Sequence, residues 1–255
     1  MRVAGLFAGV GGLESGMAAA GHEAEVLVES WAPAAAVLAA RFPGAPRLGD
    51  VREVASLPAH DLMTAGFPCQ DLSQAGRTAG IGGAKSGLVD NVFRLMDASA
   101  TPTVLLENVS FMLRLDGGVA MTRLTSAFEE RGYRWAYRTV DSLAFLQQRR
   151  QRVFLVASRV LDPAEVLFAD EVAPTEPETD LATHAHGFYW TEGIRGLGWG
   201  RDCVPTLKNG STLGIPSPPA ILLPSGEIVT PEIRDAERLQ GFPPDWTRPA
   251  AEIGL

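Results

Sequence analysis

Apolar residues in the first 160 positions form two kinds of run, and these alternate along the chain. Short apolar runs predict strands at 2–9, 24–30, 60–67, 103–109, 134–142 and 152–159. Apolar residues at helical spacing predict helices at 12–21, 33–42, 87–99 and 119–133. Because strands that alternate with helices are typical of βαβ units, we predict an α/β fold with a doubly wound, mostly parallel, Rossmann-like sheet.

The pattern changes from Leu161 onward. Residues 161–228 are rich in proline and glycine and lack helical spacing, which is typical of a small irregular or β-rich domain. Helical spacing returns at 230–242. We therefore predict two domains, a larger one formed by 1–160 plus 229–255 and a smaller one formed by 161–228.

The composition is that of a globular protein without a disulfide framework. Hydrophobic residues make up 46% of the 255 positions and charged residues 20%, so the chain can bury a proper core. The two cysteines, Cys69 and Cys203, favour a reducing, cytoplasmic setting. No cluster of cysteine and histidine has metal-ligand spacing, so we expect no metal site. No apolar run approaches the ~20 residues of a membrane span.

The charge of the chain limits how it can meet nucleic acid. A net charge of −8 argues against a protein that coats nucleic acid non-specifically. Residues 147–154, with Arg134 and Arg138, could still form a local basic cleft. A specific nucleic-acid site is therefore compatible with the acidic chain.

The turn after the first predicted strand contains several glycines. In a doubly wound fold this turn binds the cofactor. Gly9 and Gly11 allow the backbone to approach a ligand closely. Glu14 occupies the third glycine position of the dinucleotide fingerprint, so a pyrophosphate is not the expected ligand.

Acidic and aromatic residues follow the next predicted strands. Glu29 ends the second strand, at the position suited to ribose hydroxyls. Trp31 could stack on an adenine or pack in the core, and Asp50 could accept a hydrogen bond from the adenine amino group. A glycine turn and a ribose acid without the pyrophosphate signature favour a nucleoside cofactor such as S-adenosylmethionine.

Cys69 lies in the stretch GFPCQDLSQAGR, directly after the predicted strand at 60–67. Open α/β sheets place their sites at this end of their strands. A lone cysteine is most often a buried structural residue. The polar, loop-like surroundings favour the other interpretation, a thiolate nucleophile.

Two further polar groups could complete a catalytic site. Glu107 ends the very apolar strand at 103–109, and we expect it to act as an acid, with a cap of a helix or loop as the alternative. Gln148, Arg150 and Arg152 alternate, which predicts one shared strand face that recognises an anion or a base. A solvated charged face is the alternative for these three.

These groups together predict chemistry on a cytosine. The thiolate of Cys69 would add to C6, Glu107 would give a proton to N3, and Arg152 or Arg150 would stabilise charge at O2. C5 would then attack the sulfonium methyl group of S-adenosylmethionine. Because the base cannot be reached inside a duplex, it would have to be flipped out.

The chain resembles the cytosine-C5 DNA methyltransferases of bacteria and phages. The resemblance is carried by ordered stretches: LFAGVGGLESG (6–16), ES (29–30), GDV (49–51), GFPCQDLSQAG (66–76), SGLVDNVFRLM (86–96), ENV (107–109), QRRQR (148–152) and TPEIRDAERLQGFPPDW (230–246). It implies the class I methyltransferase fold, S-adenosylmethionine as cofactor, duplex DNA as partner and a covalent adduct with Cys69. It also implies a place in restriction-modification or phage defence, in a bacterial or phage-infected cell.

The resemblance also implies roles for particular residues. Catalysis falls to Cys69, Glu107, Arg150 and Arg152. The cofactor is contacted by Phe7, Gly9, Gly11, Gly12, Leu13, Glu29, Ser30, Trp31, Asp50, Val51, Pro68 and Leu88. The DNA is contacted by Gln70, Ser73, Gln74, Asn108 and Gln148, and residues 161–228 recognise the target site.

Three departures from the family pattern affect these expectations. Gly5 stands where the family commonly has Asp or Ser, so one cofactor contact could be missing. The recognition region at about 161–203 is short for the family. The family's last motif, a GN-x-V helix that completes the cofactor pocket, is absent. The chain could therefore be truncated, have an incomplete pocket, or depend on a partner chain that supplies the helix.

Two alternatives to a DNA methyltransferase stay open. A non-catalytic or split subunit would need that second chain. A tRNA cytosine-C5 methyltransferase would use the same chemistry, because one branch of the family modifies tRNA. The PCQ triplet and the recognition region favour DNA.

Overall fold

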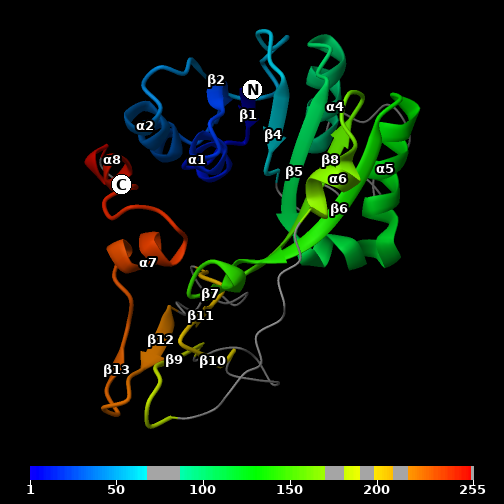
Figure 1. The fold of residues 1–255 in the computed structure, drawn as a ribbon. Helices are drawn as coiled ribbons and strands as arrows, with labels where there is room; N and C mark the ends of the chain where they lie inside the picture. The colour runs from blue at the N-terminus through cyan, green and yellow to red at the C-terminus, as the bar shows by residue number, and fades with distance from the viewer. Residues whose placement is uncertain (68–86, 170–180, 190–197, 209–217, 254–255) are drawn as a thin grey trace. The chain divides into compact units, whose positions relative to one another are not determined.

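The computed structural model describes residues 1–67, 87–169, 181–189, 198–208 and 218–253. The chain forms two compact units (Figure 1). The larger unit comprises Met1–Val140, Arg152–Asp170 and Thr247–Leu255, and the smaller unit comprises Asp141–Gln151 and Glu171–Trp246.

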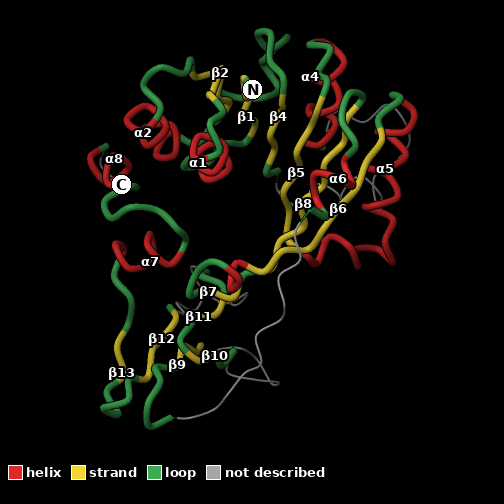
Figure 2. Tube along the Cα trace, in the orientation of Figure 1, coloured by secondary structure: helices red, strands yellow, loops and turns green. Residues whose placement is uncertain are grey.

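A seven-stranded sheet forms the centre of the larger unit (Figure 2). Its strands are β1 (Arg2–Leu6), β2 (Glu23–Val28), β3 (Arg47–Leu48), β4 (Leu62–Ala65), β5 (Thr103–Val109), β6 (Arg134–Asp141) and β8 (Gln151–Ser158). They lie in the order β3-β2-β1-β4-β5-β8-β6. The pairs from β3 to β5 are parallel, and β5 pairs with β8 in the antiparallel sense. The predicted doubly wound, mostly parallel sheet is therefore confirmed.

Helices cover both faces of this sheet. They are α1 (Gly12–Ala19), α2 (Ala32–Arg41), α4 (Leu88–Ala98), α5 (Val119–Glu130) and α6 (Pro163–Leu167), and a further helix, α8 (Arg248–Glu252), contacts α2. Side chains of α4 and α5 form the main core with Ala4 and Leu6 of β1, whereas Leu13 and Met17 of α1 pack beside Val3. This split follows from the strand period of two, which sends neighbouring side chains to opposite faces.

The smaller unit is rich in short strands. Its four-stranded sheet contains β9 (His186–Tyr189), β10 (Gly200–Arg201), β12 (Pro219–Leu222) and β13 (Ile228–Val229), in the order β10-β9-β12-β13. A separate parallel pair joins β7 (Gln148–Arg149) to β11 (Val204–Pro205). The predicted irregular, β-rich character of this region is confirmed.

One helix of the smaller unit is shorter than its pattern predicts. Helix α7 covers Ile233–Leu239 instead of 230–242. It begins after Glu232, whose backbone N–H donates to Asp235 Oδ2 at 3.1 Å, as in a capping box. Gln148 Nε2 donates to the carbonyl oxygen of Leu239 at 3.1 Å, which joins α7 to β7.

The division into units differs from the predicted domain boundaries. Residues 141–151 and 229–246 belong to the smaller unit, whereas the sequence pattern assigned them to the larger domain, and residues 161–170 belong to the larger unit instead of the predicted smaller domain. The contact between β7 and α7 explains this difference, because it joins segments far apart in the chain. The functional assignment of the two parts stays a prediction.

Within the part of the chain that the structure describes, no helix combines the length and apolarity needed to cross a bilayer. The described residues also contain no group of three or more His, Cys, Asp or Glu side chains that could hold a metal ion.

Candidate active site

The residues predicted to act together follow the carboxyl ends of parallel strands. Phe7 follows β1, Glu29 follows β2, Asp50 follows β3 and Gly66 follows β4, while Glu107 lies near the end of β5. Because parallel strands end at one edge of a sheet, these positions share that edge. The sheet thus gathers the predicted cofactor residues and the predicted acid along one line of strand ends.

The turn after β1 has a backbone suited to close contact with a ligand. Gly9 and Gly11 have φ values of 55° and 86°, in the left-handed region that favours glycine. A Cβ on Gly11 would overlap the ring of Phe42, whereas a Cβ on Gly9 would meet nothing within 4 Å. Phe7 also has a positive φ, 53°, which is uncommon for a residue with a side chain. Gly9 therefore presents open backbone at this turn.

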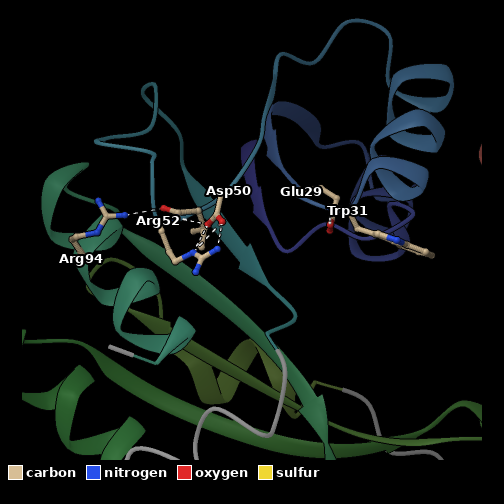
Figure 3. A network of polar contacts seen from close by, with 6 residues as sticks. Glu29, Trp31, Asp50, Arg52 and Arg94 are labelled. Atoms are coloured by element: carbon tan, nitrogen blue, oxygen red, sulfur yellow. Dashed lines mark hydrogen bonds and ion pairs between the residues drawn. The ribbon is translucent and has the colours of Figure 1, made fainter. Parts of the chain in front are cut away.

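Glu29 ties this turn to the start of α2. Its Oε2 accepts a hydrogen bond from the Gly9 N–H at 2.8 Å, and its Oε1 accepts one from the Trp31 N–H at 2.7 Å. Each carboxylate oxygen retains a further lone pair that can accept a hydrogen bond from a ligand hydroxyl. Figure 3 shows Glu29 and Trp31 side by side at this end of the sheet.

Trp31 is exposed at the first turn of α2. Its exposed fraction is 61%, so the alternative that it packs in the core is wrong. Ser30 beside it is also exposed, whereas Leu13 and Leu88 pack against the core clusters of the sheet. An exposed indole can stack on a planar ligand, and this role of Trp31 stays a prediction.

Asp50 is engaged by Arg52 two residues later (Figure 3). The backbone N–H and the Nε of Arg52 both donate to Asp50 Oδ1 at 2.9 Å, and Nε and Nη2 donate to Oδ2. These hydrogen bonds from Arg52 lower the pKa of Asp50 to about 2. The intervening Val51 is buried, and its carbonyl oxygen accepts from Arg94 Nη2 at 2.8 Å.

The buried Glu14 explains why Gly5 departs from the family pattern. Thr64 Oγ1 of β4 donates to Glu14 Oε1 at 3.0 Å, and a Cβ on Gly5 would overlap this same oxygen. Glu14 Oε2 has no partner among the described residues. Burial raises the pKa of Glu14 above its usual range. The sequence draws attention to both Gly5 and Glu14. It does not reveal that the Glu14 side chain fills the space where a side chain on Gly5 would lie.

Glu107 forms an ion pair with Arg152 of β8. Arg152 Nε lies 2.9 Å from Glu107 Oε1, and the two side chains are 15% and 23% exposed. In the antiparallel register of β5 and β8, Arg152 lies opposite Val109. This register brings Arg152 close to Glu107, although the two are far apart in the sequence. Burial lowers the pKa of Arg152, and the charge of Glu107 acts in the opposite direction.

The other oxygen of Glu107 lies close to the chain that leads to Cys69. A Cβ on Gly66 would be 3.4 Å from Glu107 Oε2. Five predicted site residues that follow, Pro68, Cys69, Gln70, Ser73 and Gln74, lie outside the described residues.

Asn108 holds the backbone at Phe67, just before the segment that contains Cys69. It is 4% exposed, and its Nδ2 donates to the carbonyl oxygen of Phe67 at 3.0 Å. Its Oδ1 accepts from the backbone N–H of Val109 at 2.9 Å. The predicted contact of Asn108 with DNA does not fit this burial, because both ends of its amide already have partners within the protein.

The prediction that Gln148, Arg150 and Arg152 share one strand face is wrong. Strand β7 ends at Arg149 and β8 begins at Gln151, so Arg150 lies between two strands. The two strands pair with different partners, which breaks the alternation of a single strand. Arg152 belongs to the larger unit, and Gln148 and Arg150 belong to the smaller one.

Gln148 also differs from its predicted role as a DNA contact. It is fully buried, and its Nε2 donates to the carbonyl oxygen of Leu239. In the smaller unit this side chain therefore connects a strand to a helix.

Comparison with known proteins adds independent information. The family model described as C-5 cytosine-specific DNA methylase matches residues 1–186. Type II methyltransferase M2.BsuMI of Bacillus subtilis is 50% identical over 266 residues, covering 100% of this chain and 68% of that protein. Type II methyltransferase M.BanI of Aneurinibacillus aneurinilyticus is 33% identical over 158 residues. That match covers 59% of this chain and only 37% of M.BanI.

A solved structure shares the fold. The S. pombe Dnmt2 methyltransferase superimposes with a TM-score of 0.67 at 15% identity. The match covers 96% of this chain and 88% of that chain. At such low identity the likeness concerns the fold alone.

Proposed function

The chain belongs to the family of C-5 cytosine-specific DNA methylases, and from that premise we propose that it methylates C5 of a cytosine flipped out of duplex DNA. The cofactor in this proposal is S-adenosylmethionine. The observation that carries the proposal is the ion pair of Glu107 and Arg152, which lies beside Gly66 at the start of the Cys69 loop. A carboxyl group held there suits the proton transfer that cytosine chemistry needs.

The proposed reaction begins with Cys69. Its thiolate adds to C6 of the cytosine while Glu107 gives a proton to N3, and Arg152 stabilises the carboxylate that remains. S-adenosylmethionine would supply the methyl group to C5, which the addition has made nucleophilic, and its S–CH3 bond would break to leave the neutral thioether S-adenosylhomocysteine. Loss of H5 to a base then restores the C5–C6 double bond. Cys69 leaves C6 as a thiolate, and the proton on N3 returns to Glu107.

The residues at the ends of the first three strands fit an adenosine cofactor. Gly9 offers open backbone, Glu29 has lone pairs for ribose hydroxyls, and Trp31 exposes an indole face. Asp50 can accept from the adenine amino group once Arg52 moves away. These four residues would hold the nucleoside, and the buried Asn108 would steady the loop that carries Cys69.

Target recognition is assigned to the smaller unit in this proposal. The pattern at 161–228 and the resemblance to the family support the assignment. In keeping with relatives that are named Type II methyltransferases, we place the chain beside a restriction or phage-defence system. Arg150 keeps its predicted role in this proposal, the stabilisation of charge at O2.

A trapping assay tests the proposal. The purified chain is incubated with S-adenosylmethionine and mixed-sequence duplex DNA that contains 5-fluorocytosine. Fluorine takes the place of H5 and cannot be removed as a proton is, so the elimination stops and the protein stays joined to the DNA. We expect an adduct that resists denaturation, detected by mass, which disappears in Cys69→Ala and persists in the matched control Cys203→Ala.

The other outcomes separate the alternatives. An adduct with tRNA containing 5-fluorocytosine, and none with DNA, would identify an RNA methyltransferase. An adduct that forms only after a polypeptide with the GN-x-V motif is added would identify a split enzyme. No adduct under any of these conditions would overturn the catalytic proposal.

A further inference from the structure

Both oxygens of the Asp50 carboxylate are engaged by Arg52. A carboxylate has about four lone-pair sites. Asp50 Oδ1 accepts from the N–H and Nε of Arg52, each at 2.9 Å, and Oδ2 accepts from Nε at 3.0 Å and from Nη2. Arg52 thus engages both oxygens through three N–H donors, with the Nε–H shared between them, so a new donor must compete with Arg52 for the carboxylate.

The segment around Asp50 is held firmly, but the Arg52 side chain is not. Arg94 of α4, labelled in Figure 3, donates to two carbonyl oxygens, that of Val51 at 2.8 Å and that of Val54 at 2.7 Å. The Arg52 side chain is 69% exposed. Among the described residues, every hydrogen bond of its guanidinium goes to Asp50. Exposed ion pairs contribute little to stability, so this side chain can swing away at low cost while the backbone stays in place.

We propose that Arg52 is a reversible cap on Asp50 that competes with the adenine amino group and thereby sets the affinity for the cofactor. This inference rests on the proposed function, because it takes the adenine of S-adenosylmethionine as the ligand of Asp50. The amino group is a neutral donor and must replace charge-assisted hydrogen bonds, which are stronger than neutral ones. Part of the binding free energy is therefore spent on opening the cap.

Calorimetric titration with S-adenosylmethionine tests the cap. Arg52→Ala leaves Asp50 open, and we expect the Kd to fall by about three- to fivefold, as suits the loss of an exposed but well-formed pair. The matched control is Arg2→Ala. Arg2 forms another exposed ion pair, with Asp61 at 3.4 Å, at the amino end of β1, and its removal changes the net charge equally. We expect no change of Kd in this control.

Two further titrations show whether the effect of Arg52→Ala acts through Asp50. Asp50→Ala should weaken binding, and adding Arg52→Ala to it should give no gain. The gain from Arg52→Ala should also vanish for a cofactor analogue whose purine lacks the amino group.

Failure of the cap and failure of the proposed function give different results. If the wild type binds S-adenosylmethionine and Arg52→Ala leaves the Kd unchanged or raises it, the cap is overturned and the proposed function stands. If neither protein binds the cofactor, both are overturned.

Discussion

Two acid–arginine pairs lie at the same edge of the larger unit's sheet, and they are built in opposite ways. Glu107 and Arg152 come from paired strands far apart in the sequence, and both side chains are largely buried. Asp50 and Arg52 are two residues apart, and the arginine is mostly exposed. The same two chemical groups are therefore fixed by the fold in one region and by a local loop in the other.

The difference shows how the surroundings of a pair decide its use. Removing water strengthens the attraction between charges, so the largely buried pair of Glu107 and Arg152 is held in one geometry, which the strand register sets. Water screens the exposed pair, which can open and close. A group that must meet a reacting atom needs the first kind of support, whereas a group that must exchange partners needs the second.

Replacing Glu107 tests the buried pair and has the largest expected effect. We expect Glu107→Gln to lower the rate of methyl transfer by about 10²–10⁴-fold, as is typical of a lost general acid. Cofactor affinity should stay within about twofold, because the cofactor residues lie at other strands. Single-turnover kinetics and titration measure the two effects. Glu129→Gln, on α5, is the control, and a near-normal rate in Glu107→Gln would remove this residue from the role.

Asn108 is also buried, and its hydrogen bond to Phe67 holds the backbone just before the segment that contains Cys69. We expect Asn108→Ala to lower methyl transfer by about 10–100-fold and to cost about 1–3 kcal/mol of stability, because two backbone groups lose a partner. Asn108→Asp sharpens the test, since it can still accept from Val109 N–H but cannot donate to the Phe67 carbonyl. If Asn108→Asp reacts at the wild-type rate, the bond to Phe67 does not position the loop.

The variant Gly5→Ala tests whether buried packing also supports the strand that leads to the predicted cofactor turn. A Cβ there would overlap Glu14 Oε1 and lie 3.1 Å from Leu27 Cδ2, so we expect Gly5→Ala to cost about 1–3 kcal/mol of stability. Gly16→Ala is the matched control, because nothing lies within 4 Å of its Cβ position in α1. Urea unfolding should show that the control is as stable as the wild type or more so.

A double variant separates packing from backbone effects at Gly5. Glu14→Ala removes the oxygen that the new Cβ meets, so the cost of Gly5→Ala should be smaller in that background. Equal costs in the two backgrounds would mean that Glu14 does not account for the glycine.

Glu14 should also make stability depend on pH. Burial raises its pKa in the folded state above the usual value of 4.5. A group of this kind stabilises the fold fully below its unfolded pKa, and the contribution is lost as the pH rises through the folded pKa. The loss is about 1.4 kcal/mol for each unit by which the pKa is raised.

The variant Glu14→Gln isolates this effect. We expect the stability of the wild type relative to Glu14→Gln to fall as the pH rises above 4.5. Urea unfolding over a pH series measures the difference, and Glu23→Gln, at an exposed position of β2, is the control. A difference that does not change with pH would contradict the assignment.

Most of the larger unit could be predicted from its sequence because the signals are local. The spacing of apolar residues reports which side of an element is buried, and this does not depend on distant segments. The predicted helix at 87–99 and strand at 103–109 match α4 and β5 closely for this reason. The glycine turn after β1 and the acids at strand ends were found in the same way.

The joint between the units shows where local signals fail. The alternation of Gln148, Arg150 and Arg152 predicted a single strand, but β7 and β8 pair with β11 and β5 and leave Arg150 between them. Pairing partners are chosen by contacts between distant segments. The spacing of residues within a short stretch carries no record of that choice.

The sequence by itself determined the fold class, the order of the motifs and the family, because these depend on residue types and their spacing. Only the tertiary structure decided that Glu14 fills the space beside Gly5, that Asn108 turns inward to Phe67, and that Arg152 meets Glu107. The last two contacts join residues far apart in the chain, and the first is made when helix α1 packs back on strand β1. Such contacts depend on strand register and packing, which arise only when the whole chain is folded.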